Sequence, residues 1–202
     1  MRCGGWALHI AEATQGAGHL AKAEPALKHP KASDAARHIF QQKIAVHKAE
    51  KRTIAYIDES GFAHDMPRTH GYSAIGTRCF GTHNWQAKDR VNVIGALIGK
   101  LLLTVSLFSA NVDADTFYSW TVQDLLPKLP PKSILVMDNA TVHKRADILS
   151  AITQAGHTIE FLPPYSPDLN PIENKWAHAK KRRRKIQCSI DELFQIESFY
   201  VA

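Results

Sequence analysis

The sequence predicts an α/β domain built on a mixed β-sheet with helices on its faces. Short apolar runs of strand length alternate with segments of helical periodicity along most of the 202 residues. Apolar residues make up 45 % of the chain, which is typical of a globular protein with a buried core. A chain of this length has room for one domain of ordinary size and a helix or two beside it.

The amino-terminal part is expected to lie outside this domain. Residues 1–25 are rich in Gly and Ala and show no sustained period, so we expect them to be poorly ordered or weakly helical. Residues 26–52 contain a helical pattern over about 33–51, with Ser33 as a suitable N-cap, and are expected to form a linker helix. The α/β domain is then expected to occupy residues 53–202.

Five apolar runs are expected to form the strands, and segments of helical pattern follow three of them. The expected strands are 53–58, 90–99, 101–108, 133–138 and 158–162. The expected helices begin at Asp113 or Asp115, near residue 144, at Asn170 and at Ser189. Three strands, a helix, a strand, a helix, a strand and closing helices form an order that is compatible with a ribonuclease H-like fold. Residues 61–89 are a long connection, of a kind that is usually functional or disordered.

One apolar segment, 91–108, has about the length of a membrane span. Gly99 and Lys100 divide it into two β-branched halves, so a β-hairpin is predicted and no membrane partner. The three cysteines are far apart and in no CxxC pair, which favours a reducing cytosol over a disulfide framework or a zinc ribbon.

The positive charge of the chain is concentrated near its carboxyl end. The formal net charge is +6, and seven of the eleven residues in 175–185 are Lys or Arg. A basic run is often a solvated helix face, but here it follows a candidate catalytic helix. We therefore expect it to bind a polyanion, nucleic acid before membrane.

Three acidic residues are the candidate catalytic groups. Asp58 and Asp138 each follow an apolar run, and Glu173 begins a helix that a third run precedes. Each has a structural alternative: a turn at Asp58, an Asx turn at Asp138 and a capping box at Glu173. Together they would meet at the edge of the sheet where the strands end, which is where ligands bind in open α/β sheets. Clustered carboxylates repel one another, and hard divalent cations relieve that repulsion, so a two-metal phosphodiester site is predicted.

Three blocks of sequence around these residues resemble a known family. They read IDES at 57–60, MDNA at 137–140 with His143 following, and PYSPDLNPIE at 164–173. These blocks resemble the catalytic blocks of DDE transposases of the bacterial insertion sequence 630 family, within the Tc1/mariner superfamily. The 34 residues between Asp138 and Glu173 match the spacing of that group, and the similarity extends from about residue 26 to the carboxyl terminus.

The resemblance implies a ribonuclease H-like core that cuts DNA at transposon ends and joins the 3′ hydroxyl to a target, usually at TA. It implies that Asp58, Asp138 and Glu173 are the ligands of Mg²⁺ or Mn²⁺, with two ions bound. It also implies a homo-oligomer when the protein is active. Asn139 and His143 match further family positions and are expected to orient ligands or contact DNA; for His143, bonding to the local backbone is the alternative.

Further residues are candidates for contact with DNA. Arg68, with Gly71 and Tyr72, matches a loop block of the family, and the alternative is that these residues only fold the connection back onto the core. Tyr165 can stack on a base or pack beneath its loop, and Trp176 is expected in the core. The expected phosphate contacts of the basic run are Lys175, Lys180, Lys181, Arg182, Arg183, Arg184 and Lys185.

The chain departs from the family at its amino terminus. Family members normally begin with a helix-turn-helix region, and residues 1–25 do not resemble it, so we expect a catalytic part that lacks the usual DNA-binding region. Two other functions stay open at this point. One is an inactive remnant that binds DNA or a relative and inhibits transposition; the other is a structure-selective nuclease of the same fold.

Overall fold

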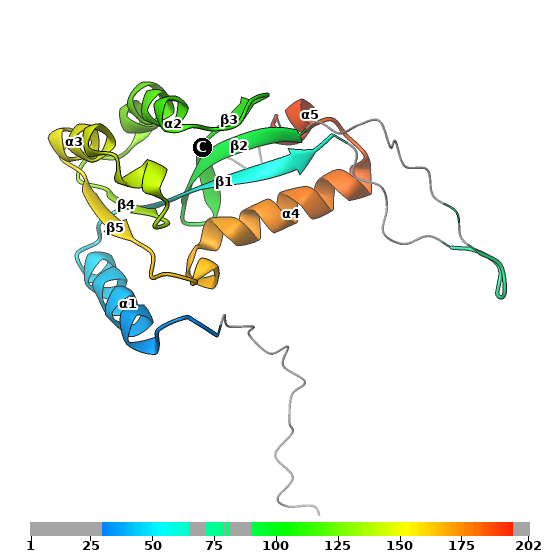
Figure 1. Cartoon of the computed structure of the whole chain (residues 1–202), viewed down its shortest axis with the longest axis horizontal. Helices are drawn as coiled ribbons and strands as arrows, with labels where there is room; N and C mark the ends of the chain where they lie inside the picture. Colours follow the sequence, from blue (N-terminus) through cyan, green and yellow to red (C-terminus); the bar gives the residue numbers. More distant parts are fainter. Residues whose placement is uncertain (1–29, 65–71, 79, 81–89, 196–202) are drawn as a thin grey trace, which may run out of the picture.

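The computed structural model describes residues 30–64, 72–78, 80 and 90–195 and has a five-stranded mixed sheet at its centre (Figure 1). The strand order is β3-β2-β1-β4-β5. On one side of the central strand β1, the pairs β1·β2 and β2·β3 are antiparallel; on the other side, β1·β4 and β4·β5 are parallel. The strands are β1 (Ile54–Ala63), β2 (Arg90–Ile98), β3 (Leu101–Phe108), β4 (Ile134–Met137) and β5 (Thr158–Phe161). The predicted mixed sheet and its chain order are confirmed.

The helices follow the predicted order. They are α1 (Asp34–Ala49), α2 (Ala114–Trp120), α3 (Ala146–Gln154), α4 (Pro171–Ile186) and α5 (Ile190–Phe194). The helix predicted to run from Asp113 to Pro127 is not uniform, because a π-helical turn and a 3-10 turn follow α2. A short 3-10 helix (Thr141–Lys144) also precedes α3, so the predicted start of that helix near residue 144 was too early.

Helices cover both faces of the sheet, α2 and α3 on one side and α1 and α4 on the other (Figure 1). Side chains alternate along β1, so Ala55 and Ile57 belong to the core beneath α2 and α3. On the other face, Ile54 packs with α1, and Phe62 packs with α4 and α5. The same alternation directs Asp58 toward the face that α4 covers.

Strand β1 is longer than predicted, which corrects the placement of Asp58. The sequence predicted a strand over residues 53–58 with Asp58 at its end, but β1 continues to Ala63 because β2 pairs with it from Ala55 to Ala63. The parallel pairing of β1 with β4 ends at Tyr56. Asp58 therefore lies inside β1, just beyond the end of the β4 pairing, and the turn that was its structural alternative is not formed.

The segment that resembled a membrane span is the predicted hairpin. Its two halves are β2 and β3, with Gly99 in the left-handed conformation (φ 61°) at the turn between them. Among the residues that the structure describes, no helix is long and apolar enough to cross a membrane.

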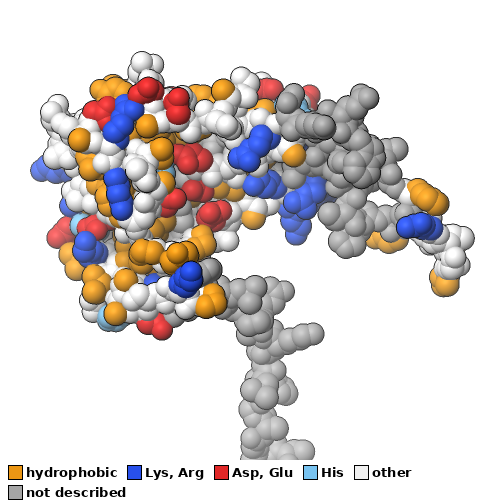
Figure 2. All heavy atoms as spheres, viewed as in Figure 1, with side chains coloured by type: hydrophobic (Ala, Val, Ile, Leu, Met, Phe, Trp, Pro, Cys, Tyr) orange, Lys and Arg blue, Asp and Glu red, His pale blue; other side chains and the backbone are white. Residues whose placement is uncertain are grey.

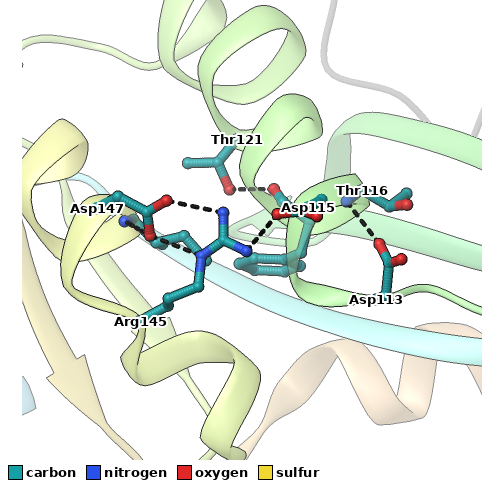
Figure 3. Close-up of polar contacts among 8 residues, drawn as sticks. Asp113, Asp115, Thr116, Thr121, Arg145 and Asp147 are labelled. Carbon is teal, nitrogen blue, oxygen red and sulfur yellow. Dashed lines mark hydrogen bonds and ion pairs between the residues drawn. The ribbon is translucent and has the colours of Figure 1, made fainter.

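Arg145 joins the two helices on the α2 and α3 side of the sheet (Figure 3). Its guanidinium donates to Asp115 (2.5 Å) and to both carboxylate oxygens of Asp147 (2.7 Å each). Asp113 caps α2 by accepting from the Thr116 amide (2.8 Å), so of the two predicted caps Asp113 is the cap and Asp115 pairs with Arg145.

Candidate active site

The three predicted acidic residues line one cavity of about 360 Å³. Asp58 comes from β1, Asp138 follows β4, and Glu173 lies in the first turn of α4. The Pro-rich loop between β5 and α4 forms the remaining wall, through Leu162, Pro163, Pro164, Tyr165, Ser166, Pro167 and Asn170. The fold thus brings together the residues that the sequence predicted would meet.

The carboxyl group of Asp58 has a raised pKa. Burial raises the pKa of its carboxyl group, and the negative charges of Glu173 and Glu59 raise it further, to about 7. A side-chain hydrogen bond supports the carboxylate: the indole N–H of Trp176 donates to Asp58 Oδ2 over 3.1 Å. Trp176 was expected in the core, and it is buried there, but it also contacts a candidate catalytic group.

Asp138 is held by His143. The imidazole of His143 is 1 % exposed and lies between two carboxylates, with Nδ1 2.6 Å from Asp138 Oδ1 and Nε2 2.9 Å from Glu59 Oε1. Burial lowers the pKa of His143, but the two carboxylates outweigh burial and raise it to about 9. The His143 hydrogen bond in turn lowers the pKa of Asp138. Asp138 Oδ1 also accepts from the Ala140 amide (2.9 Å), so the Asx turn exists alongside the proposed catalytic role.

Glu173 does not form the capping box that was its structural alternative. Helix α4 begins after Asn170 with no side-chain cap, and the Asn170 amide donates to the Pro167 carbonyl (2.8 Å) instead of to Glu173. The Glu173 side chain lines the cavity and raises the pKa of Asp58 by its charge. Asn170 also lines the cavity, and its buried Oδ1 has no hydrogen-bond partner in the described part of the chain.

The Pro-rich wall is fixed from two sides. Asn139 donates a hydrogen bond from its side-chain amide to the Leu162 carbonyl, so its observed role is to tie the end of β4 to the loop. From outside, Arg37 of α1 donates to both oxygens of Asp168, at 2.9 and 2.5 Å. Tyr165 lines the cavity at this wall and is 51 % exposed, with φ 56°.

The basic residues of α4 divide into two groups. The side chain of Lys180 turns toward β1, donating to Ser60 Oγ (2.8 Å) with its Nζ 5.2 Å from the centre of the Phe62 ring. Arg183 was expected to contact DNA with its neighbours, but it is buried and donates to the carbonyls of Ala63, His64 and Cys188. Its observed role is structural.

The other Lys and Arg side chains of α4 are more exposed than Arg183. Lys181 and Lys185 are exposed, and Lys175, Arg182 and Arg184 are partly exposed. Figure 2 shows Lys and Arg side chains gathered over the path of α4, next to a group of acidic side chains. A positive surface therefore adjoins the carboxylate cavity, as a DNA-binding surface requires.

Part of the prediction lies outside the described residues. Arg68, Gly71 and residues 1–25 are not among the described residues. Tyr72 is described, and its side chain is fully exposed.

Sequence reasoning missed the role of Glu59. This residue follows Asp58 in β1, its side chain lies on the opposite face of the sheet, and it faces His143. It also missed the hydrogen bond from Trp176 to Asp58. The spacing could have indicated it, because Trp176 is three residues after Glu173 and therefore lies on the same side of α4.

The residues of the cavity fit a divalent cation by their chemistry. Three carboxylates and the unpartnered Asn170 Oδ1 supply only oxygen, the ligand atom that Mg²⁺ and Mn²⁺ prefer. Burial is the main cause of the raised pKa of Asp58, and the negative charges of Glu173 and Glu59 raise it further; a bound cation would relieve that part of the repulsion. Among the described residues, no three His, Cys, Asp or Glu side chains are arranged so that they could hold a metal ion, so the fit is one of ligand chemistry and not of geometry.

Comparison with known proteins identifies the family. Residues 53–194 match the model of the DDE superfamily endonucleases, so the chain belongs to this family. Comparison with curated protein sequences gave no significant match.

Solved structures of Mos1 transposase share the fold. The Mos1 paired-end complex with the left transposon end has a TM-score of 0.63 and 16 % identity, over 83 % of this chain and 54 % of the Mos1 chain. The mariner Mos1 paired-end complex with Mg has a TM-score of 0.63 and 17 % sequence identity, over 91 % of this chain and 62 % of the Mos1 chain. The catalytic domain of Mos1 mariner transposase has a TM-score of 0.55 and 13 % sequence identity, over 86 % of each chain. The predicted ribonuclease H-like fold is thereby confirmed, and the chain spans about half of the Mos1 chain in the first of these complexes.

Proposed function

We propose that this chain is the catalytic part of a transposase of the insertion sequence 630 family, which cleaves DNA at the ends of its element. The freed 3′ hydroxyl is then joined to a target, at TA. One observation carries the proposal: carboxylates from β1, from the end of β4 and from the start of α4 line a single cavity in a DDE endonuclease fold. Mos1, which shares the fold, was crystallised as a strand transfer complex and with Mg or Mn.

The proposed roles of the residues follow from the geometry. Asp58, Asp138 and Glu173 would hold Mg²⁺ or Mn²⁺. When bound, such ions activate an attacking water or hydroxyl and stabilise the leaving oxygen of a phosphodiester. His143 keeps Asp138 ionised and fixes its Oδ1 through the 2.6 Å hydrogen bond. The solvent-exposed basic side chains along α4 would hold the DNA phosphates beside the cavity.

Other partners of the active protein follow from the same proposal. Paired transposon ends require two active sites, so a homo-oligomer is the expected active form. A bacterial source, with action on nucleoid DNA, is expected for a member of the insertion sequence 630 family. The oligomeric state and the bacterial source are therefore parts of the same proposal.

The test is cleavage of DNA that carries the terminal repeats flanking the coding region, measured with Mg²⁺ or Mn²⁺ and with EDTA. We expect the wild-type chain to nick this DNA only with the cation, and Asp138→Asn to lose at least about 100-fold in rate. Asp191→Asn, an exposed substitution outside the cavity, is the matched control and should cleave as the wild type does. Equal activity of Asp138→Asn would overturn the mechanism. A wild-type chain that binds the repeats without cutting them would favour the inhibitory remnant.

A further inference from the structure

The buried indole of Trp176 links α4 to β1 at the candidate catalytic residue Asp58. Trp176 is 1 % exposed, and its Nε1–H donates to Asp58 Oδ2 over 3.1 Å. The rings of Phe62 and Phe194 meet the indole at steep angles, with centroids 6.3 and 6.2 Å away. Packing therefore restricts the ring on several sides, so its N–H points in a fixed direction.

A glycine makes room for this ring. Gly95 of β2 pairs with Asp58 of β1 in the antiparallel register. A Cβ atom at position 95 would lie 2.6 Å from Trp176 Cη2 and 2.9 Å from Cζ2, closer than carbon atoms approach one another. Any larger residue at this position would displace the indole.

Burial alone does not require this arrangement. Trp120 is also a core tryptophan, 4 % exposed, and its Nε1 has no hydrogen-bond partner among the described residues. The Trp176 N–H instead reaches a carboxylate that is surrounded by the negative charges of Glu173 and Glu59. A donor at that point bonds directly to the Asp58 carboxylate and limits its rotation.

We propose that Trp176 is a positioning residue for Asp58, and that Gly95 is required because it leaves space for the indole. By occupying Oδ2, the N–H leaves Oδ1 as the oxygen with which Asp58 binds a divalent cation. This inference rests on the proposed function, because it assumes that Asp58 is a metal ligand. It adds a residue of the core, Trp176, to those that determine metal affinity.

The experiment measures Mn²⁺ binding to the full chain by isothermal titration calorimetry, with no DNA present. Trp176→Phe keeps an aromatic ring and removes the N–H, so we expect the affinity to fall about tenfold or more. Trp120→Phe is the matched control, since it removes an indole of equal size without removing a hydrogen bond, and its affinity should stay within about twofold of the wild type. Thermal unfolding of each variant shows that the compared proteins are folded.

Gly95→Ala tests the same contact without changing the indole. Its added methyl group should push the ring from Asp58 and weaken Mn²⁺ binding about as much as Trp176→Phe does. A phenyl ring lacks Cη2 and Cζ2, so adding Gly95→Ala to Trp176→Phe should cause little further loss. This non-additivity separates a shared effect on Asp58 from two independent packing defects.

The outcomes distinguish the two proposals. Wild-type binding of Mn²⁺ with unchanged affinity in Trp176→Phe would overturn the positioning role and leave the proposed function standing. An equal loss in Trp120→Phe would also overturn it, because any core defect would then suffice. A wild-type chain that binds no Mn²⁺ would contradict the proposed function and this inference together.

Discussion

Asp138 and His143 share a hydrogen bond of 2.6 Å, and the other imidazole nitrogen of His143 lies 2.9 Å from Glu59. Glu59 and Asp138 come from β1 and from the end of β4, so the imidazole joins neighbouring parallel strands beside the cavity. His143 also packs against the Phe117 ring, with centroids 4.4 Å apart. Its side chain is therefore held by polar and apolar contacts at once.

Replacing His143 by Phe should lower the cleavage rate about 10- to 100-fold, because Asp138 loses the donor that orients it. The phenyl ring keeps the contact with Phe117, so the chain should stay folded. Cleavage of terminal-repeat DNA under single-turnover conditions is the measurement. His157→Phe, a change at another buried histidine whose Nδ1 accepts from the Ser133 amide, should affect stability but not the rate of the folded protein. Unchanged cleavage by His143→Phe would contradict the orienting role.

The Arg37–Asp168 pair should stabilise the docking of α1 on the Pro-rich loop. It joins residues 131 positions apart with two hydrogen bonds, and the Arg37 side chain is 15 % exposed. Bidentate geometry and partial burial lead us to expect a coupling energy of about 1 kcal/mol between Arg37→Met and Asp168→Asn in urea unfolding. The same cycle for Lys43 and Glu160, where Lys43 is 54 % exposed, should give a smaller value. A coupling near zero for the first pair would show that the contact contributes little.

Replacing the exposed basic residues of α4 should weaken DNA binding, whereas replacing the buried Arg183 should lower stability. Neutral replacement of Lys181, Arg184 and Lys185 should weaken nonspecific DNA binding and reduce the slope of log affinity against log salt by up to about 3. Arg183→Met should leave that slope nearly unchanged. It should instead destabilise the chain by about 2 kcal/mol, because three carbonyls lose a charged donor. Fluorescence anisotropy at several salt concentrations, together with urea unfolding, measures both effects. A reduced slope in Arg183→Met alone would reverse the assignment.

Asp124 should contribute stability that is lost in acid. Burial raises the pKa of Asp124, but hydrogen bonds from Lys128 (2.5 Å) and Thr104 (2.5 Å) outweigh burial and lower it. A folded-state pKa below the unfolded value means that the stabilisation is complete above about pH 4 and disappears as the pH falls below it. The difference in free energy of unfolding between the wild type and Asp124→Asn should therefore be about 1 kcal/mol at pH 7 and shrink below pH 4. A difference that is the same at pH 7 and pH 3 would exclude this linkage.

Much of the fold could be predicted from the sequence because the apolar runs are bounded by clear turn residues. The hairpin of β2 and β3 around Gly99 is an example. The extent of β1 could not be predicted, since residues 58–61 are polar or Gly and form a strand only because β2 offers a complete partner. The tertiary partner, and not local propensity, decides such a boundary.

The candidate site, like the fold, could be predicted only in part from the sequence. The convergence of Asp58, Asp138 and Glu173 could be predicted from the ends of the apolar runs and the start of α4, although Asp58 lies within β1. The separation of Arg183 from its basic neighbours could not be read from the run of charges, because it depends on which side of α4 faces β1. The position of Glu59 beside His143 likewise required the three-dimensional pairing of β1 with β4.

The most direct test of the central claim is an anomalous difference map from Mn²⁺-soaked crystals of the wild-type chain. Cleavage of terminal-repeat DNA by the same preparation is measured in parallel. We predict an anomalous peak in the cavity, about 2.2 Å from carboxylate oxygens of Asp58 and Asp138, with Glu173 binding this ion or a second one about 4 Å away. A cavity without anomalous density, in a preparation that cleaves DNA with Mn²⁺, would contradict the account.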